Sequence, residues 1–320
     1  MKKEINIYHE LEETTRIFKN NIPKELLKPP IINSLLKDVL IDYIIIILSM
    51  ILYTFSFFAI KILLLVIIVS RLHSLGVILH DLTHMPIKKK NYKIIILEIL
   101  AGYPIGTSIN AMRYHHLRHH KESGMETDPY FHHFKNYNKN NVLLKIFNIM
   151  IGFILIPSWI LRSIFGVVCL LHPKLQILYA KKFLEHKGEI RIQDLNEIRQ
   201  CCQEDIKQII YLSVLFFMCI KLAGFNLFFQ LYIIPILFTG VISYYRTLKE
   251  HNYKRVYDRK LITLINITNN HNTDNFLKFL LAPRNIGYHI EHHLHPQVGY
   301  KYLKKIRNHY LKYNKDIYKC

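Results

Sequence analysis

Histidines in three short patterns are the residues of this chain whose type and spacing suggest chemistry. The 320-residue sequence holds 19 histidines, ten of them in HDLTH, RYHHLRHH and GYHIEHHLHP. On a helix, residues at positions i, i+3 and i+4 lie on one face, so each pattern can direct its histidines toward one region. The candidate metal ligands are His80 and His84 in the first pattern, His116, His119 and His120 in the second, and His289, His292 and His293 in the third.

The chemistry predicted by this set is that of a transition-metal site. Neutral imidazoles bind iron, zinc, copper or nickel, and the three patterns contain no cysteine. Eight imidazoles exceed the four ligands of a tetrahedral zinc site, which favours a dinuclear centre with several histidines per metal. Asp81 stands where the HExxH motif of zinc proteases has its glutamate, which argues against that class. A ninth candidate ligand is His251, in RTLKEH at the end of an apolar stretch.

Other polar residues lie within or beside these patterns. Metal-bound imidazoles usually donate their second N–H to a carboxylate or carbonyl, and we expect this role for Asp81, Glu122, Asp128 and Glu291. Glu250 is expected to orient His251 or a neighbour. His271 could be a tenth contact, although its surroundings, NNHNTDN, are typical of a loop. His115 and His295 are expected to stay outside the site.

Membrane helices must position these patterns. Residues 39–60 and 62–80 are almost wholly apolar, and so are residues 209–225 and 227–245. About 20 helical residues, rising roughly 1.5 Å each, cross the ~30 Å hydrocarbon core, so each pair predicts a transmembrane hairpin. The turns are expected near Phe57–Lys61 and Gly224–Asn226.

The basic residues predict which side of the membrane holds the histidines. All but four of the 43 Lys and Arg residues lie outside the apolar stretches, the exceptions being Lys61, Arg71, Arg162 and Lys221. By the positive-inside rule, both termini and the histidine patterns are cytoplasmic. Residues 92–109 and 146–171 are also apolar. If either stretch crossed the membrane once, the histidine patterns that follow it would lie on the opposite side. We therefore interpret both stretches as interfacial or re-entrant helices. A pair of additional crossings is the alternative.

Composition argues against several other classes of protein. A chain that is 51% hydrophobic buries enough apolar surface to offset its ordering entropy, which excludes disorder. The net charge of +20 is compatible with nucleic-acid binding, but the basic residues flank membrane spans instead of forming a binding module. The five cysteines include no CxxC spacing and predict no disulfide framework.

The motifs HDLTH, RYHHLRHH, RTLKEH and NIGYHIEHHLHP resemble those of the integral-membrane fatty acid desaturase superfamily, which includes hydroxylases and ketolases. The resemblance runs from His80 to Pro296. It implies an all-α integral membrane protein with four spans in two hairpins, interfacial helices and a cytosolic helical cap. It also implies a non-haem di-iron centre held by the nine candidate histidines, His251 included.

The resemblance further implies a reaction. Iron and O2 would introduce a double bond into a long acyl chain carried by a lipid, by CoA or by a carrier protein. Some relatives carry a fused cytochrome b5 domain with an HPGG motif, whereas His172-Pro173-Lys174 lacks these glycines. Electrons are therefore expected from a separate ferredoxin or cytochrome b5, steered by the basic cytoplasmic face. An apolar channel would hold the chain. Phe and Tyr residues of the spans, with Trp159, are candidates to line it, although ordinary packing or interface anchoring is the favoured role for each.

Two other functions stay open at this point. A hydroxylase or ketolase of a fatty acid, alkane or carotenoid would use the same histidines. A metal transporter is less favoured, because transporters place polar groups near the bilayer midplane and often contain repeats. The chain is interpreted as one domain over residues 1–320: a cytosolic segment (1–38), membrane helices with the first histidine motifs (39–245) and a cytosolic cap (246–320).

Overall fold

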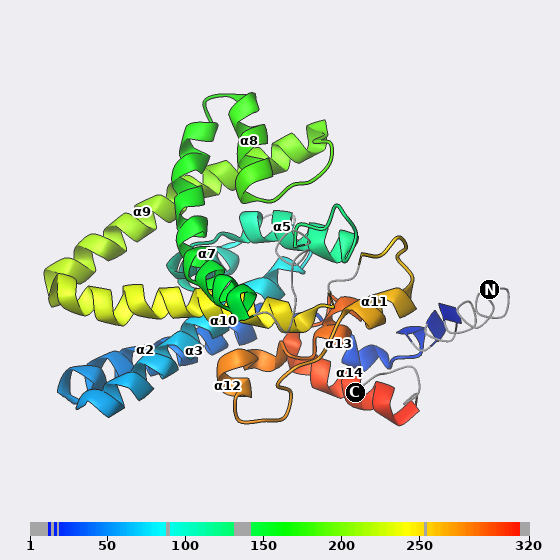
Figure 1. Cartoon of the computed structure of the whole chain (residues 1–320), viewed down its shortest axis with the longest axis horizontal. Helices are drawn as coiled ribbons and strands as arrows, with labels where there is room; N and C mark the ends of the chain where they lie inside the picture. Colours follow the sequence, from blue (N-terminus) through cyan, green and yellow to red (C-terminus); the bar gives the residue numbers. More distant parts are fainter. Residues whose placement is uncertain are drawn as a thin grey trace.

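Helices form almost all of the regular structure of the chain (Figure 1). The computed structural model describes residues 12–13, 16–17, 19–87, 90–130, 142–252 and 255–313. Within these ranges the only β pairing is a single bridge between His251 and Thr268. The predicted all-α class is therefore confirmed for the described residues.

The first predicted hairpin consists of α2 (Ile32–Phe55) and α3 (Phe58–Thr83), which lie side by side. Its turn is formed by residues 56–57, at the start of the region predicted for it. Tyr53 closes the end of α2, because its carbonyl accepts a hydrogen bond from the backbone N–H of Ser56.

The surface of this hairpin is largely apolar, and the two aspartates of α2, Asp38 and Asp42, are buried. Ile44 and Leu48 on α2 keep 57% and 54% of their surface exposed. Arg71, one of the four basic residues within or between apolar stretches, places its Nη1 3.1 Å from the Asp42 carboxylate of α2. A charged side chain within an apolar helix is expected to face a partner in this way rather than lipid.

The second hairpin turns at Gly224, as predicted. Gly224 has a φ of 78°, a left-handed conformation that glycine adopts without a Cβ clash. It lies near the end of α9 (Ile192–Phe228), which continues through a π-helical turn, η4 (Phe229–Ile233), into α10 (Ile234–Glu250). The helix begins well before the predicted start at residue 209, because the first part of α9 packs on α7 and α8. Both hairpins turn on the same side of the molecule (Figure 1).

The stretch predicted as an interfacial or re-entrant helix after the first hairpin is broken. It forms α4 (Tyr92–Leu97), the π-helical η2 (Glu98–Gly102) and the short η3 (Tyr103–Ile105). A 77° bend then leads into α5 (Ile109–Glu122), which carries the second histidine pattern. The Ser108 hydroxyl caps α5 by accepting a hydrogen bond from the Ala111 N–H.

The other stretch predicted as interfacial forms α7 (Val142–Cys169), which is followed by α8 (Pro173–Phe183). α7 crosses α10 where two glycines meet (Figure 1). A Cβ at Gly152 would lie 2.7 Å from the Val241 Cα, and one at Gly240 would collide with the Gly152 carbonyl oxygen. The two backbones therefore touch at this crossing, and any larger side chain there would push the helices apart.

Three helical segments of the described chain have the length and hydropathy needed to cross a membrane: α3, Ile146–Cys169 within α7, and Ile192–Glu250, which runs from α9 through α10. The bent pair Tyr92–Ile105 and Ile109–Glu122 becomes a fourth if it is one broken span. These helices indicate a membrane protein. The presence of four membrane spans and the location of α7 at the membrane interface remain predictions.

The C-terminal region packs on the end of the first hairpin opposite its turn (Figure 1). Arg284 makes this attachment, because its guanidinium lies 3.0 Å from Asp38 Oδ1 and 2.9 Å from Asp42 Oδ1, and its Nε donates to Ser74 Oγ. The region comprises α11 (Leu261–Ile267), α12 (Lys278–Leu281), η5 (Pro283–Asn285), α13 (His289–Leu294) and α14 (Tyr300–Tyr313), with η1 (Lys24–Leu26) from the N-terminal segment against α14.

Candidate metal centre

All nine histidines predicted as metal ligands come together in two neighbouring groups. They come from the end of α3, from α5, from the residue that follows α10 and from α13. Within each group the potential ligand atoms lie within 4.8 Å of one another. The first group is His80, His84, His116, His120 and His292, and the second is His119, His251, His289 and His293.

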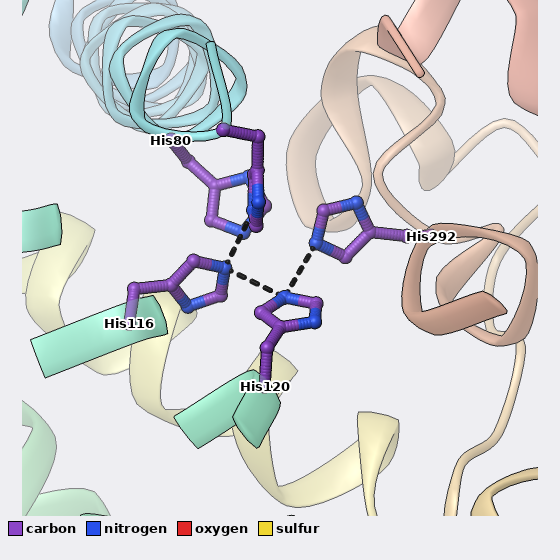
Figure 2. Close-up of side chains that lie close together, drawn as sticks. His80, His116, His120 and His292 are labelled. Atoms are coloured by element: carbon purple, nitrogen blue, oxygen red, sulfur yellow. Dashed lines mark hydrogen bonds between the residues drawn. The ribbon is translucent and has the colours of Figure 1, made fainter. Parts of the chain in front are cut away.

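The first group converges through its Nε2 atoms (Figure 2). His116 Nε2 lies 3.0 Å from His84 Nε2 and 2.9 Å from His120 Nε2. His120 Nε2 lies 3.0 Å from His292 Nε2, across 172 residues of sequence. Figure 2 shows the His80 ring beside this chain of imidazoles, and its centroid is 4.2 Å from that of His116.

In the second group the Nε2 atoms also approach one another, and all four histidines are buried. His289 Nε2 lies 3.0 Å from both His251 Nε2 and His293 Nε2. The His119 ring stands perpendicular to those of His251 and His293, at centroid distances of 4.7 Å and 5.2 Å. His119 Nε2 is buried without a hydrogen-bond partner among the described residues.

These contacts fit a pair of metal ions better than a hydrogen-bond network. A neutral imidazole has one N–H and one lone pair, so a single Nε2 cannot satisfy two other Nε2 atoms. Two ligands at a right angle on one ion, with bonds of about 2.0–2.1 Å, are about 2.9 Å apart. The observed separations of 2.9–3.0 Å match that spacing.

Burial keeps the second group in the form that binds metal. Removal from water, together with the neighbouring His119, lowers the pKa of His251 to about 3. Burial, together with His251, holds the pKa of His293 well below its ordinary value. Both imidazoles are therefore neutral at physiological pH and carry a free lone pair for a metal ion.

Each three-histidine pattern divides its residues between the groups. In α5, His116 and His120, four residues apart, belong to the first group, while His119 belongs to the second. In α13 the arrangement is reversed: His289 and His293 join the second group, and His292 joins the first. The two helices thus lie between the groups and contribute to both.

One of the four predicted supporting carboxylates contacts a candidate ligand. Asp128 Oδ1 lies 2.9 Å from His119 Nδ1 and accepts a hydrogen bond from the Tyr130 N–H, while Oδ2 accepts one from the Gly124 N–H. Burial alone would raise the pKa of Asp128, but His119 and these two amides hold it below its ordinary value. His119 therefore faces an ionised carboxylate.

The hydrogen bonds and ion pairs of the other three carboxylates lie elsewhere. Asp81 accepts from the Tyr300 N–H, Glu122 pairs with Arg259, and Glu291 accepts from the Asn270 amide. Burial raises the pKa of Glu291 to about 7. Their expected role beside the metal ligands is not supported by these contacts.

Glu250 lies behind the second group, as expected for an orienting residue. Its Oε1 is 3.2 Å from His271 Nε2 and 3.6 Å from His289 Nδ1, and Arg246 pairs with it at 3.1 Å. His271 thus contacts Glu250 and belongs to neither histidine group. His295 also lies outside them, because its Nε2 is 2.8 Å from the Tyr310 hydroxyl.

A mostly apolar cavity, called here the inner cavity, adjoins the first group and has a volume of about 180 Å³. His80 and His116 form part of its wall, together with apolar residues that include Leu72, Ile156 and Trp159. The structure thus places Trp159 at the channel wall, the role that the sequence favoured less than ordinary packing.

The sequence did not single out Tyr130, which also lines the inner cavity and stacks on the His119 ring at 4.0 Å. Its position two residues after Asp128 was the available signal. Arg246 was another missed lining residue, and its spacing of four residues from Glu250 on a helix was the corresponding signal.

Comparison with known proteins places the chain in a family. The profile of the family described as Fatty acid desaturase matches residues 56–318, a range that contains all nine histidines and the inner cavity. A search of curated proteins finds no match. The match covers most of the chain, so this protein belongs to the fatty acid desaturase family, and membership implies an integral membrane oxidoreductase.

Proposed function

We propose that the protein is a membrane fatty acid desaturase that uses O2 to introduce a double bond into a long acyl chain. The observation that carries this proposal is the position of two histidine groups beside a mostly apolar cavity. Family membership supports the same chemistry. In the proposed reaction two neighbouring CH2 groups each lose one hydrogen. O2 takes these two hydrogens with their two electrons, and it takes two further electrons from a donor and two protons from solvent, so that it leaves as two water molecules.

In this proposal each histidine group holds one iron ion. The first ion would be bound by His80, His84, His116, His120 and His292, and the second by His119, His251, His289 and His293. Bound iron would supply the activation of O2 and the removal of hydrogen from an unactivated CH2 group.

The protein's own residues position the reactants. The inner cavity excludes water and holds the acyl chain against His80 and His116. Asp128 holds the His119 ring in one orientation by accepting from Nδ1–H, which leaves Nε2 for the metal. The Glu250 carboxylate lies on the Nδ1 side of His289, at 3.6 Å, and places a negative charge behind that imidazole.

The proposed topology has four spans, from α2, α3, the second half of α9, and α10. The stretch from α4 to η3 and helix α7 would then lie at the interface, and both termini and the histidine groups would be cytoplasmic. The excess of Lys and Arg residues outside the apolar stretches supports this orientation. A separate ferredoxin or cytochrome b5 would donate electrons at the basic cytoplasmic face. The whole chain, residues 1–320, would act as one domain.

Product analysis tests this function and separates it from hydroxylation or ketone formation. Expression in a host with few kinds of fatty acid is expected to yield acyl chains that lack two hydrogens, and mass spectrometry would locate the new double bonds. A His293→Ala variant is expected to yield none. Chains that gain an oxygen atom would instead identify a hydroxylase or ketolase. Zinc binding alone, with unchanged lipids, would contradict both enzymes.

An Asp128→Asn variant is expected to bind iron less tightly in the second group. Asparagine keeps the size of the side chain but removes the negative charge that faces His119, and loss of such a partner typically weakens metal affinity about 10–100-fold. Iron content measured against increasing chelator concentration would reveal the change. Glu126→Gln, at an exposed carboxylate whose ion-pair partner is Arg255, is the control. Equal retention of iron by the two variants would contradict this role for Asp128.

A further inference from the structure

A second hollow lies on the outside of α7 and α10. This outer groove has a volume of about 530 Å³, and its walls include Ile149 on α7 and Ile242 and Leu248 on α10. Ile149 keeps 49% of its surface exposed, so the groove opens at the outer face of α7. Nearly all of its lining is apolar.

The outer groove and the inner cavity share one wall residue, Tyr244. This side chain is only 4% exposed, and it lines both hollows. The inner cavity continues beyond it to His80 and His116 of the first histidine group. The Tyr244 side chain therefore borders both the outer groove and the cavity that adjoins the candidate metal centre.

The close contact of α7 with α10 lies between the two hollows along α7. Gly152 and Gly240 bring the backbones of the two helices together at this point. On α7, Ile149 precedes the crossing and lines the outer groove, whereas Ile156 follows it and lines the inner cavity. The crossing thus lies between the two hollows along α7. Along α10 the residues that line the two hollows alternate between Thr239 and Lys249, and Tyr244 lines both.

The lining of the outer groove suits the part of a phospholipid where an acyl chain joins the headgroup. Its walls suit an acyl chain, while Lys249 and Asn148 supply a cation and an amide for a phosphate and an ester carbonyl. Lys249 is exposed at the end of α10, with its Nζ 5.5 Å from the Tyr245 ring centre. Lysine and tyrosine at the end of a membrane helix commonly lie at headgroup level.

We propose, resting on the desaturase function above, that the substrate is an acyl chain of a bilayer phospholipid. The chain enters sideways through the outer groove and passes Tyr244 into the inner cavity. The headgroup stays at Lys249. A water-soluble CoA or carrier-protein ester would instead approach from the polar part of the inner cavity, near Glu185 and Arg246.

Crosslinking tests this route without relying on turnover. The full-length protein is placed in nanodiscs of equal parts phosphatidylcholine and phosphatidylglycerol, with a diazirine midway along one acyl chain. Without O2 or reductant, illumination is expected to label peptides of the inner cavity, including the one with Trp159. Ile149→Trp fills the outer groove and is expected to reduce this labelling about tenfold, equivalent to about 1.4 kcal/mol. Leu248→Trp, from the opposite wall, is expected to do the same.

Ile154→Trp is the matched control, because Ile154 is also an exposed isoleucine of α7 (60%) and lies outside both hollows. It is expected to leave the labelling unchanged. Label confined to outward-facing residues, or equal labelling in Ile149→Trp and Ile154→Trp, would overturn the proposed route. Active enzyme that uses acyl-CoA but no phospholipid would also overturn it while leaving the desaturase function intact. Failure of that function would show separately, as the absence of any oxygen-dependent product from either substrate.

Discussion

A His292→Ala variant is expected to lose the metal of the first histidine group and, with it, oxygen-dependent activity. His292 is the residue of α13 in that group, and its Nε2 lies 3.0 Å from His120 Nε2. Loss of a ligand's hydrogen-bond partner already weakens metal binding about 10–100-fold, so removal of the ligand itself is expected to exceed about 100-fold. Metal analysis of purified protein is expected to find iron at the second group only.

His295→Ala is a closely matched control for this result. His295 belongs to the same sequence motif and is buried to the same degree, 2% exposed against 1% for His292. Its Nε2 contacts the Tyr310 hydroxyl at 2.8 Å and takes part in neither histidine group. The variant is expected to keep both metals. If both alanine variants lost the same amount of iron, the effect would come from damage to α13 and not from loss of a ligand.

An Arg162→Leu variant is expected to destabilise the fold by about 3–5 kcal/mol, because it would leave a buried carboxylate without its cation. Arg162 is fully buried between α7 and α9, with Nη1 2.9 Å from Asp205 Oδ1 and 2.6 Å from the Tyr179 hydroxyl. The Tyr179 hydroxyl in turn donates to Asp205 Oδ2 at 2.6 Å. Thermal unfolding in detergent would measure the loss.

The double variant Arg162→Leu with Asp205→Leu is expected to recover most of this stability, since replacing both members of a buried ion pair by apolar residues is often neutral. Arg199→Leu, at an exposed arginine of α9, is expected to change stability little. A double variant as unstable as Arg162→Leu alone would show that the packing of Arg162, and not the unpaired charge, accounts for the loss.

The sequence predicted the residues of the candidate site more completely than their arrangement. Spacings of three and four residues identify histidines that share a helix face, and all nine candidates lie in the two groups. The same spacings do not show that His119 joins a different group from His116 and His120. That division depends on the angle at which α5 and α13 approach each other, which short-range spacing does not encode.

For the fold, likewise, the sequence located the elements but not the contacts between them. Apolar length located both hairpins, and Gly224 located the second turn, because few other residues adopt its left-handed conformation without strain. The sequence shows Arg162 within an apolar stretch, but its partner, Asp205, lies 43 positions away and only helix packing brings it near. The supporting carboxylates depended equally on packing: Asp128 reaches His119, whereas Glu291 on α13 faces Asn270 instead.

The sequence by itself determined the helical class, the two hairpins, the imidazole chemistry of the candidate site and the identity of its nine histidines. These properties follow from local composition and from spacing within single helices. Only the tertiary structure decided how the histidines divide into two groups, which carboxylate supports them, and how the inner cavity and outer groove lie on opposite sides of Tyr244. These features arise where α3, α5, α7, α10 and α13 meet. Their geometry depends on helix crossings, such as the contact of Gly152 with Gly240, that join segments distant in sequence.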